Sequence, residues 1–157
     1  MPISQRLSPS ASRLVRSAQV AHLATADAQG QPLVIPICFA FDGKEFFSPI
    51  DEKPKRVSAQ KLKRLRNIHQ NPQVSLVIDH YEEDWRRLAY VLVTGRGKVL
   101  SRGKKHHKAV ALLRKKYLQY RHMAIHERPM IAIKPNRWHT WENRAGRSPD
   151  SKTITKR

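Results

Sequence analysis

Three basic side chains follow one another closely where a predicted strand gives way to a predicted helix. Lys53, Lys55 and Arg56 come directly after the segment 47–51. Unpaired backbone N–H groups at the start of a helix bind anions, and basic side chains beside them complete a phosphate site. The spacing therefore favours a site for a phosphorylated cofactor, with an exposed basic turn as the alternative.

A second cluster lies at a predicted connection between two strands. It combines Asp79, His80 and Trp85 with a run of acidic residues. The flat indole of Trp85 offers a stacking face, as at the rim of a pocket, while an ordinary charged loop is the more usual explanation. Trp138 and Trp141 follow the last predicted strand, where large aromatic residues more often seal a core or a subunit interface than contact a ligand.

Other chemistries have little support in the sequence. The pairs His106–His107 and His122/His126 could place imidazoles together, but no carboxylate or thiol spacing supports a zinc site. Cys38 is the only cysteine, which excludes an internal disulfide, and its place on the small-residue side of a predicted strand indicates a buried thiol. The sequence lacks the P-loop, dinucleotide-binding and G-x-S-x-G motifs, so hydrolase and nucleoside-triphosphatase functions have no support.

Strands must position these residues, and turn signals divide the chain into about six of them. They are Val20–Ala26, Leu33–Phe41, Glu45–Ser48, Val74–Tyr81, Leu88–Leu100 and Met130–Lys134. Large and small residues alternate in the second of these, as in a strand with one face in a core, and Pro36 indicates an edge or a bulge. Even spacing of short strands favours a small antiparallel barrel, mainly β with flanking helices, over a doubly wound sheet.

Three helices are predicted between and before these strands. The first follows a cap at Ser10–Ser12, the second runs from Ser58 to Asn71, and the third runs from about Lys105 to Tyr120. The chain therefore divides into an N-terminal helical segment (1–19), a barrel domain (20–141) and a basic tail (142–157) that we expect to be disordered.

The net charge is +19, and fifteen of the 31 basic residues lie in two acid-free segments, Lys53–Arg66 and Arg102–His122. Positive charge organised in this way predicts an anionic partner, for which nucleic acid is one candidate, although solvated helix faces also carry such runs. No apolar run approaches the ~20 residues of a membrane span, and the first ten residues lack the apolar core of a secretory signal. We expect a cytoplasmic protein with no membrane partner.

Several short segments follow one another in an order typical of one family. They are Val20–Asp27, Gly30–Pro32, Val34–Ala40, Lys53–Arg56, Leu65–Ile68, Asn71–Pro72, Val74–Tyr81 and Arg137–Trp138. Together they resemble the pyridoxamine 5'-phosphate oxidase-like family of FMN-binding split barrels. The resemblance covers roughly residues 18–141 and is closer to the branch that depends on the deazaflavin coenzyme F420.

This resemblance implies a six-stranded antiparallel split β-barrel that forms a homodimer, with two cofactor sites at the interface. In such relatives the ring of FMN or coenzyme F420 transfers hydride to a small organic substrate, so no catalytic side chain is expected. Carried over position by position, Lys53, Lys55 and Arg56 hold the cofactor phosphate. The other cofactor-binding positions are Ser48, Pro49 and Ile50 beside the phosphate and ring, Pro36 and Cys38 near the ring, Asp79, His80 and Trp85 on the ring or substrate side, and Trp138 and Trp141 from the partner subunit.

The sequence departs from the family in two places. Leu88–Val91 replaces a tryptophan-rich stretch of close relatives, which affects the substrate wall, and the basic tail is atypical. We expect an oxidoreductase that depends on coenzyme F420 or FMN. Two other functions stay open: a non-catalytic nucleic-acid-binding protein, based on the basic segments, and a haem- or tetrapyrrole-binding split barrel, based on the breadth of the family.

Overall fold

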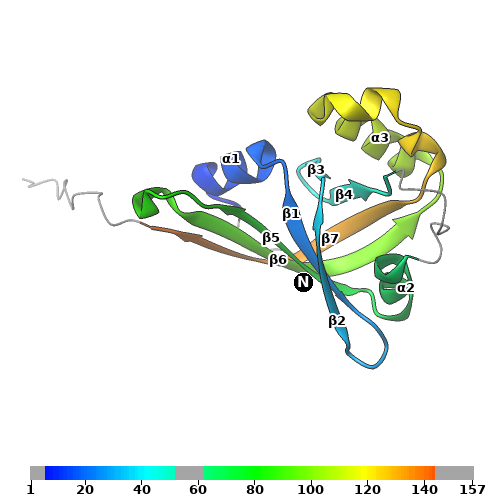
Figure 1. Cartoon of the computed structure of the whole chain (residues 1–157), viewed down its shortest axis with the longest axis horizontal. Helices are drawn as coiled ribbons and strands as arrows, with labels where there is room; N and C mark the ends of the chain where they lie inside the picture. The colour runs from blue at the N-terminus through cyan, green and yellow to red at the C-terminus, as the bar shows by residue number, and fades with distance from the viewer. Residues whose placement is uncertain (1–5, 52–61, 144–157) are drawn as a thin grey trace, which may run out of the picture.

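The computed structural model describes residues 6–51 and 62–143, in which a curled antiparallel sheet carries helices on its concave and outer sides (Figure 1). The helices are α1 (Pro9–Ser17), α2 (Lys63–Gln70) and α3 (Lys104–Lys116), with short 3-10 turns η2 (Trp85–Arg87), η3 (Leu118–His122) and η4 (Ile125–Glu127). The strands are β1 (Ala21–Ala26), β2 (Pro32–Ile37), β3 (Ala40–Phe41), β4 (Phe46–Pro49), β5 (Gln73–His80), β6 (Ala89–Leu100) and β7 (Met130–Glu142). The expected antiparallel barrel with flanking helices is confirmed, as a sheet in the order β2-β1-β5-β6-β7-β4-β3.

The described part of the chain has seven strands where six were predicted, because the run 33–41 divides into β2 and β3. The division falls at Phe39, whose backbone N–H donates to the Tyr117 hydroxyl at 2.9 Å while its carbonyl accepts from the same hydroxyl at 2.9 Å. A side chain 78 residues away thus replaces the strand partner at this point. The chain leaves β1, and β3 pairs with β4 instead.

The last strand is much longer than predicted. β7 continues past Lys134 to Glu142, and it pairs with β6 along its whole length. The register shifts between Thr94 and Gly95, opposite Pro135. Proline has no N–H to give to a ladder and is tolerated in a sheet at such a bulge, so it interrupts the pattern of alternation without ending the strand.

The N-cap of helix α1 lies two residues before the predicted one. Ser8 is the N-cap, and its hydroxyl accepts from the Ala11 N–H at 3.2 Å, while Pro9 occupies the first helical position. Ala11 and Val15 are buried on the sheet and belong to the main core. The third helix is shorter than predicted, because α3 ends at Lys116 rather than at Tyr120 and the 3-10 turn η3 follows it.

Two hydrophobic clusters hold the sheet and helices together. The larger packs α1 and α2 against the inner face, around Leu23, Leu76 and Val93. The second packs α3 against β3, β4 and the start of β7, around Phe47 and Leu113. Because these clusters lie on the two sides of β4, the end of that strand is held firmly from both directions.

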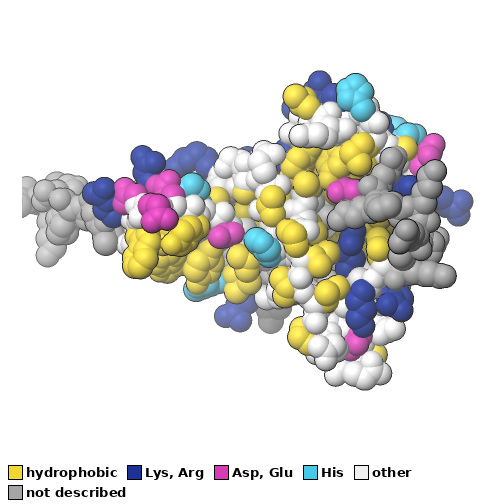
Figure 2. Space-filling view, viewed as in Figure 1, with side chains coloured by type: hydrophobic (Ala, Val, Ile, Leu, Met, Phe, Trp, Pro, Cys, Tyr) yellow, Lys and Arg dark blue, Asp and Glu magenta, His cyan; other side chains and the backbone are white. Residues whose placement is uncertain are grey.

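Beyond α1 the sheet extends into an arm, which comprises the ends of β5, β6 and β7 with η2 (residues 79–92 and 138–143). Figure 1 shows the arm at the left, at the opposite end of the molecule from α3 and β4. Hydrophobic side chains gather along it below acidic residues at its tip (Figure 2). No helix in the described ranges is long and apolar enough to cross a membrane.

Candidate cofactor-binding site

The end of β4 carries three of the predicted cofactor-binding residues. Ser48, Pro49 and Ile50 are all buried, with Ser48 only 2% exposed, and the Ile50 N–H donates to the Pro129 carbonyl at 3.2 Å. Asp51 follows and is half-buried. Lys53, Lys55 and Arg56 lie outside the described residues, between this point and α2. The structure therefore fixes both ends of the predicted phosphate-binding loop.

Helix α2, at the far end of this loop, begins with cations. Lys63, Arg64 and Arg66 lie in its first turn, which contains no acidic residue, and its N-cap Leu62 makes no side-chain capping hydrogen bond. The start of a helix carries partial positive charge, so cations there are unfavourable unless an anion is near. Lys63 meets Asp27 at 3.1 Å, which leaves two of the three cations without a carboxylate in contact among the described residues.

Arg64 connects the two ends of the loop. Its guanidinium is half-buried, and burial lowers its pKa while the charge of Asp51 opposes that change. A half-buried guanidinium beside a helix start without a side-chain cap is suited to bind a further anion. Neither Arg64 nor Asp51 is among the predicted site residues, because their proximity depends on how β4 and α2 pack together.

Cys38 lies on the α3 side of this region, beside two tyrosines. It is half-buried rather than buried as predicted, and it packs against the cluster that contains Tyr117 and Tyr120. The Tyr120 hydroxyl donates to the Asp51 carboxylate at 2.9 Å, and burial raises the pKa of Tyr120, with contributions from Cys38 and Asp51. Burial also raises the pKa of Tyr117 to about 12. Both hydroxyls stay protonated and act as hydrogen-bond donors.

Pro36 belongs to the outer face of the sheet instead. Residues directly opposite one another in paired strands share a face of the sheet. Strand pairing places Pro36 in a row of such residues that crosses five strands. The row runs Pro36, His22, Val77, Leu92 and His139. These side chains are exposed or half-buried, so the outer face presents a mixed apolar and imidazole surface.

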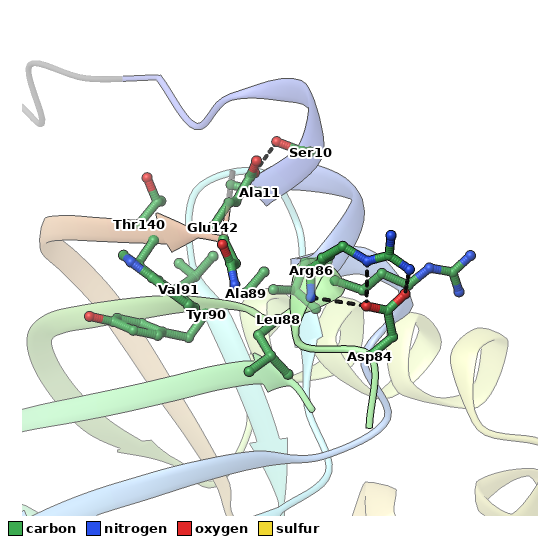
Figure 3. A pocket seen from close by; sticks show the side chains of 14 residues that line it. Ser10, Ala11, Asp84, Arg86, Leu88, Ala89, Tyr90, Val91, Thr140 and Glu142 are labelled. Atoms are coloured by element: carbon green, nitrogen blue, oxygen red, sulfur yellow. Dashed lines mark hydrogen bonds and ion pairs between the residues drawn. The ribbon is translucent and has the colours of Figure 1, made fainter. Parts of the chain in front are cut away.

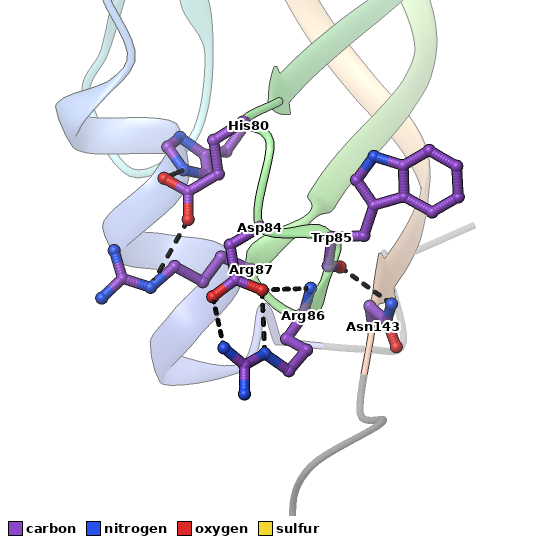
Figure 4. Close-up of polar contacts among 7 residues, drawn as sticks. His80, Asp84, Trp85, Arg86, Arg87 and Asn143 are labelled. Carbon is purple, nitrogen blue, oxygen red and sulfur yellow. Dashed lines mark hydrogen bonds and ion pairs between the residues drawn. The ribbon is translucent and has the colours of Figure 1, made fainter.

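Asp79 and His80 end β5 and Trp85 begins η2, so all three lie on the arm. Figure 4 shows His80 and Trp85 with the polar contacts around them. The acids at the tip pair locally: Asp84 binds Arg86 at 2.8 Å, and Glu82 binds His80 at 3.2 Å and Arg87 at 3.4 Å.

Trp85 takes part only through its backbone carbonyl, which accepts from the Asn143 side chain at 2.8 Å. Its indole, 63% exposed, points away from the charged residues (Figure 4). The acids of the tip are thus used to order the turn, and the indole is free to contact another surface.

The two tryptophans of β7 have different surroundings. Trp138 lies at the margin of the main core. Its ring packs edge-on against Phe41, with 5.8 Å between ring centroids, and at a tilt against Phe46, with 5.6 Å between centroids. Trp141 stacks on Tyr90 at 5.8 Å and is 42% exposed. Core packing accounts for Trp138, whereas Trp141 remains accessible on the arm.

A groove of about 600 Å³ lies between the arm and the start of α1 (Figure 3). Ser10 contacts Glu142 across it, and Asp84, which also lines it, is paired with Arg86. Of the predicted site residues that the structure describes, only Trp141 lines this groove. Within the described residues, no group of three or more His, Cys, Asp or Glu side chains could hold a metal ion.

The end of β4 and Trp141 lie far apart along the sheet. Ser48 pairs with Ile131 near the start of β7, and Trp141 lies ten residues further along that strand. A strand rises about 3.3 Å per residue, which separates the two positions by about 30 Å.

Comparison with known proteins agrees with this architecture. The sequence model for pyridoxamine 5'-phosphate oxidase matches residues 7–142. No curated protein matches the sequence.

Three solved structures illustrate the similarity in fold. A conserved hypothetical protein from Mycobacterium tuberculosis is 18% identical, with a TM-score of 0.72 over 93% of this chain and 91% of that one. The haem storage protein HutZ from Vibrio cholerae is 18% identical, with a TM-score of 0.67 over 88% and 95% of the two chains. An F420 reductase is 19% identical, with a TM-score of 0.61 over 85% and 98%.

Proposed function

Since the chain belongs to the pyridoxamine 5'-phosphate oxidase family, we propose that it is an oxidoreductase that binds coenzyme F420 or FMN and reduces a small organic substrate. The cofactor phosphate would be held by the loop between β4 and α2. The ring of a bound flavin or deazaflavin supplies hydride transfer, while the protein binds it, orients it and excludes water.

The observation that carries this proposal is the start of α2. Arg64 and Arg66 lie at the positive end of a helix with no acid in the first turn and no side-chain cap. A phosphate at this point would accept from the backbone N–H groups of Lys63 and Arg64 at the helix start and from the Arg64 side chain, and it would relieve the unfavourable arrangement of charge. Lys53, Lys55 and Arg56 would add further cations from the loop. The residues present therefore fit a phosphorylated cofactor.

The remaining groups would come from a second copy of the chain in a homodimer. Cys38 lies beside the tyrosines that border the end of β4, and the exposed Trp85 and Trp141 lie on the arm, with Trp141 about 30 Å further along β7. In a two-fold dimer, the arm of one chain can reach the β4 end of the other. Asp79 and His80 would then face the substrate side of the partner's site.

Charge favours coenzyme F420 over FMN. FMN presents one phosphate, whereas the deazaflavin cofactor has an extended polyanionic tail. Seven cations lie between Lys53 and Arg66, with no acid among them, which is more than one phosphate needs. The haem storage neighbour makes haem the alternative ligand.

The proposal is tested by titrating the purified full chain separately with FMN, reduced and oxidised coenzyme F420, and haemin, with absorbance and fluorescence as readouts. The Lys55→Ala/Arg56→Ala variant removes two phosphate contacts, each worth ~1.5–3 kcal/mol when charge-assisted, so affinity should fall at least about 100-fold. The matched control is Arg102→Ala/Lys104→Ala, which removes the same charge from exposed positions at the start of α3. It should change affinity by less than about 3-fold.

Three results would contradict the proposal: no binding of FMN or coenzyme F420, tight binding of haemin alone, or equal losses in the two variants. The last result would mean that general charge, rather than a phosphate site at this loop, attracts the cofactor.

A further inference from the structure

A second groove, separate from the proposed cofactor loop, lies where α1 and α3 end. Figure 1 shows β3 between the two helices in this view. The groove, of about 320 Å³, is lined by residues from the ends of both helices and from β3. Its apolar lining includes Val15, Phe41 and Leu112. The volume falls within the range of about 300–1,000 Å³ that is typical of small-molecule sites.

Three cations line this groove, and no acidic residue of the described chain lines it. Arg16 comes from the last turn of α1, and Lys115 and Lys116 from the last turn of α3. Cations at helix C-termini interact favourably with the helix dipole, which accounts for their presence on each helix. It does not account for their convergence on one apolar groove, where their charges repel one another.

Lys116 is the most constrained of the three. Its ammonium lies 3.8 Å from the centroid of the Phe39 ring and 5.3 Å from that of Tyr117, and the side chain is half-buried. No carboxylate contacts it among the described residues, although Lys105 and Lys108 on the same helix pair with Glu45 and Asp42. A half-buried ammonium without a carboxylate is costly, and a bound anion would compensate for that cost.

We propose that this groove binds a small organic anion, whose apolar body lies against Val15, Phe41 and Leu112 and whose carboxylate is held by Arg16, Lys115 and Lys116. The ligand class follows from the combination of an apolar lining with convergent positive charge. This binding would be additional to that of the cofactor and does not depend on it.

The groups that face Lys116 make this binding depend on pH. They are the Cys38 thiol, the Tyr117 hydroxyl and the two neighbouring cations Arg16 and Lys115. Burial lowers the pKa of Lys116 to about 8. The ammonium is therefore lost as the pH rises past that value, and affinity for an anion should fall while Arg16 keeps its charge.

The experiment uses 2-naphthoate as the probe and 2-naphthamide as its neutral counterpart, with calorimetry on the full chain. Naphthoate should bind at least about 10-fold more tightly than the amide, because one ionised group meets three cations. Raising the pH from neutral to about 9.5 should weaken naphthoate binding several-fold and leave the amide unchanged.

The Arg16→Gln/Lys115→Gln variant should weaken naphthoate binding by about 5- to 10-fold, since both side chains are exposed and each contributes modestly. The control Arg13→Gln/Lys104→Gln changes exposed cations of the same two helices that do not line the groove, and it should have less than about a 2-fold effect. Because all four positions are exposed, both variants should fold.

Equal binding of naphthoate and naphthamide would overturn the proposal, as would equal effects of the two variants. Displacement of naphthoate in proportion to bound FMN or coenzyme F420 would also overturn it, since the probe would then occupy the cofactor site.

Discussion

Replacing Lys116 with methionine should stabilise the protein at neutral pH. The change keeps an unbranched side chain over the Phe39 ring and removes the ammonium that lies 3.8 Å from the ring centroid. Burial lowers the pKa of this lysine from 10.5 to about 8, so the folded protein holds the charged form less favourably than the unfolded chain does. Thioether sulfur also packs well against aromatic rings.

Three considerations determine how much the Lys116→Met substitution changes the free energy of unfolding: the change in pKa, solvent screening and the cation–π contact. At about 1.4 kcal/mol per pH unit, the change in the pKa of Lys116 corresponds to at most ~3.4 kcal/mol. The side chain is only half-buried and solvent screens the ammonium, so about half of this applies. The cation–π contact with Phe39 offsets a further ~0.5–1 kcal/mol. We therefore expect Lys116→Met to raise the free energy of unfolding by about 1 kcal/mol.

The difference should depend on pH in a defined direction. Between about pH 8 and 10.5 the unfolded chain binds a proton at Lys116 that the folded chain has lost, so wild-type stability rises across this window. The advantage of the methionine variant should therefore disappear as the pH approaches 10. Above that, the raised pKa of Tyr117 acts in the opposite direction, since the unfolded tyrosine ionises first.

Urea denaturation of both proteins at several pH values between 7 and 10 measures this directly, with Lys104→Met as an exposed control on the same helix. Destabilisation of the Lys116→Met variant by 1 kcal/mol or more at neutral pH would show that the cation–π contact outweighs desolvation. A difference that does not change with pH would show that the lysine is not desolvated.

Three further perturbations test other parts of the structure. Gly95→Ala would place its Cβ 2.3 Å from a backbone oxygen of β7 and should cost about 2–3 kcal/mol of unfolding free energy. Gly97→Ala, whose Cβ would meet only side chains at 3.2 Å or more, should cost less than about 1 kcal/mol. Urea denaturation measures both. Tyr117→Phe leaves the buried N–H of Phe39 without its partner and should cost about 1–3 kcal/mol by the same measurement. Trp141→Ser should shift the proposed homodimer toward monomer in sedimentation velocity, with unchanged far-UV circular dichroism; an unchanged sedimentation coefficient would place the interface elsewhere.

The strands were largely predictable because alternation and turn signals are local. The division of the run 33–41 into β2 and β3 at Phe39 was not predictable, because it depends on the Tyr117 hydroxyl, 78 residues away. The length of β7 was missed for a related reason: Pro135 and the bulge interrupt the pattern, and only pairing with β6 shows that the strand continues. Sequence patterns thus located the elements, and long-range contacts determined where they end.

The candidate site divides in the same way. The basic loop that contains Lys53, Lys55 and Arg56 is visible in the sequence as a run of charge. The polar residues that border this loop cannot be recognised from the sequence, because the Tyr120–Asp51 hydrogen bond joins positions 69 residues apart. Cys38 was expected to be buried in a strand, but the chain between β2 and β3 leaves it half-exposed beside those tyrosines.

The structure also distinguishes the two basic segments that the sequence treats alike. In the segment 102–121, four of the eight cations bind oxygen atoms of the protein. Lys105 and Lys108 bind carboxylates, Arg114 donates to the carbonyls of Tyr120 and Met123, and Arg121 donates to the carbonyl of Arg114. At the start of α2, by contrast, only Lys63 has a carboxylate in contact among the described residues. A nucleic acid needs a row of free cations along one face, since each phosphate contact releases a counterion. Half of the α3 row is already used to hold its own fold. Within the described residues, α3 therefore does not present the continuous row of free cations that a polynucleotide would need.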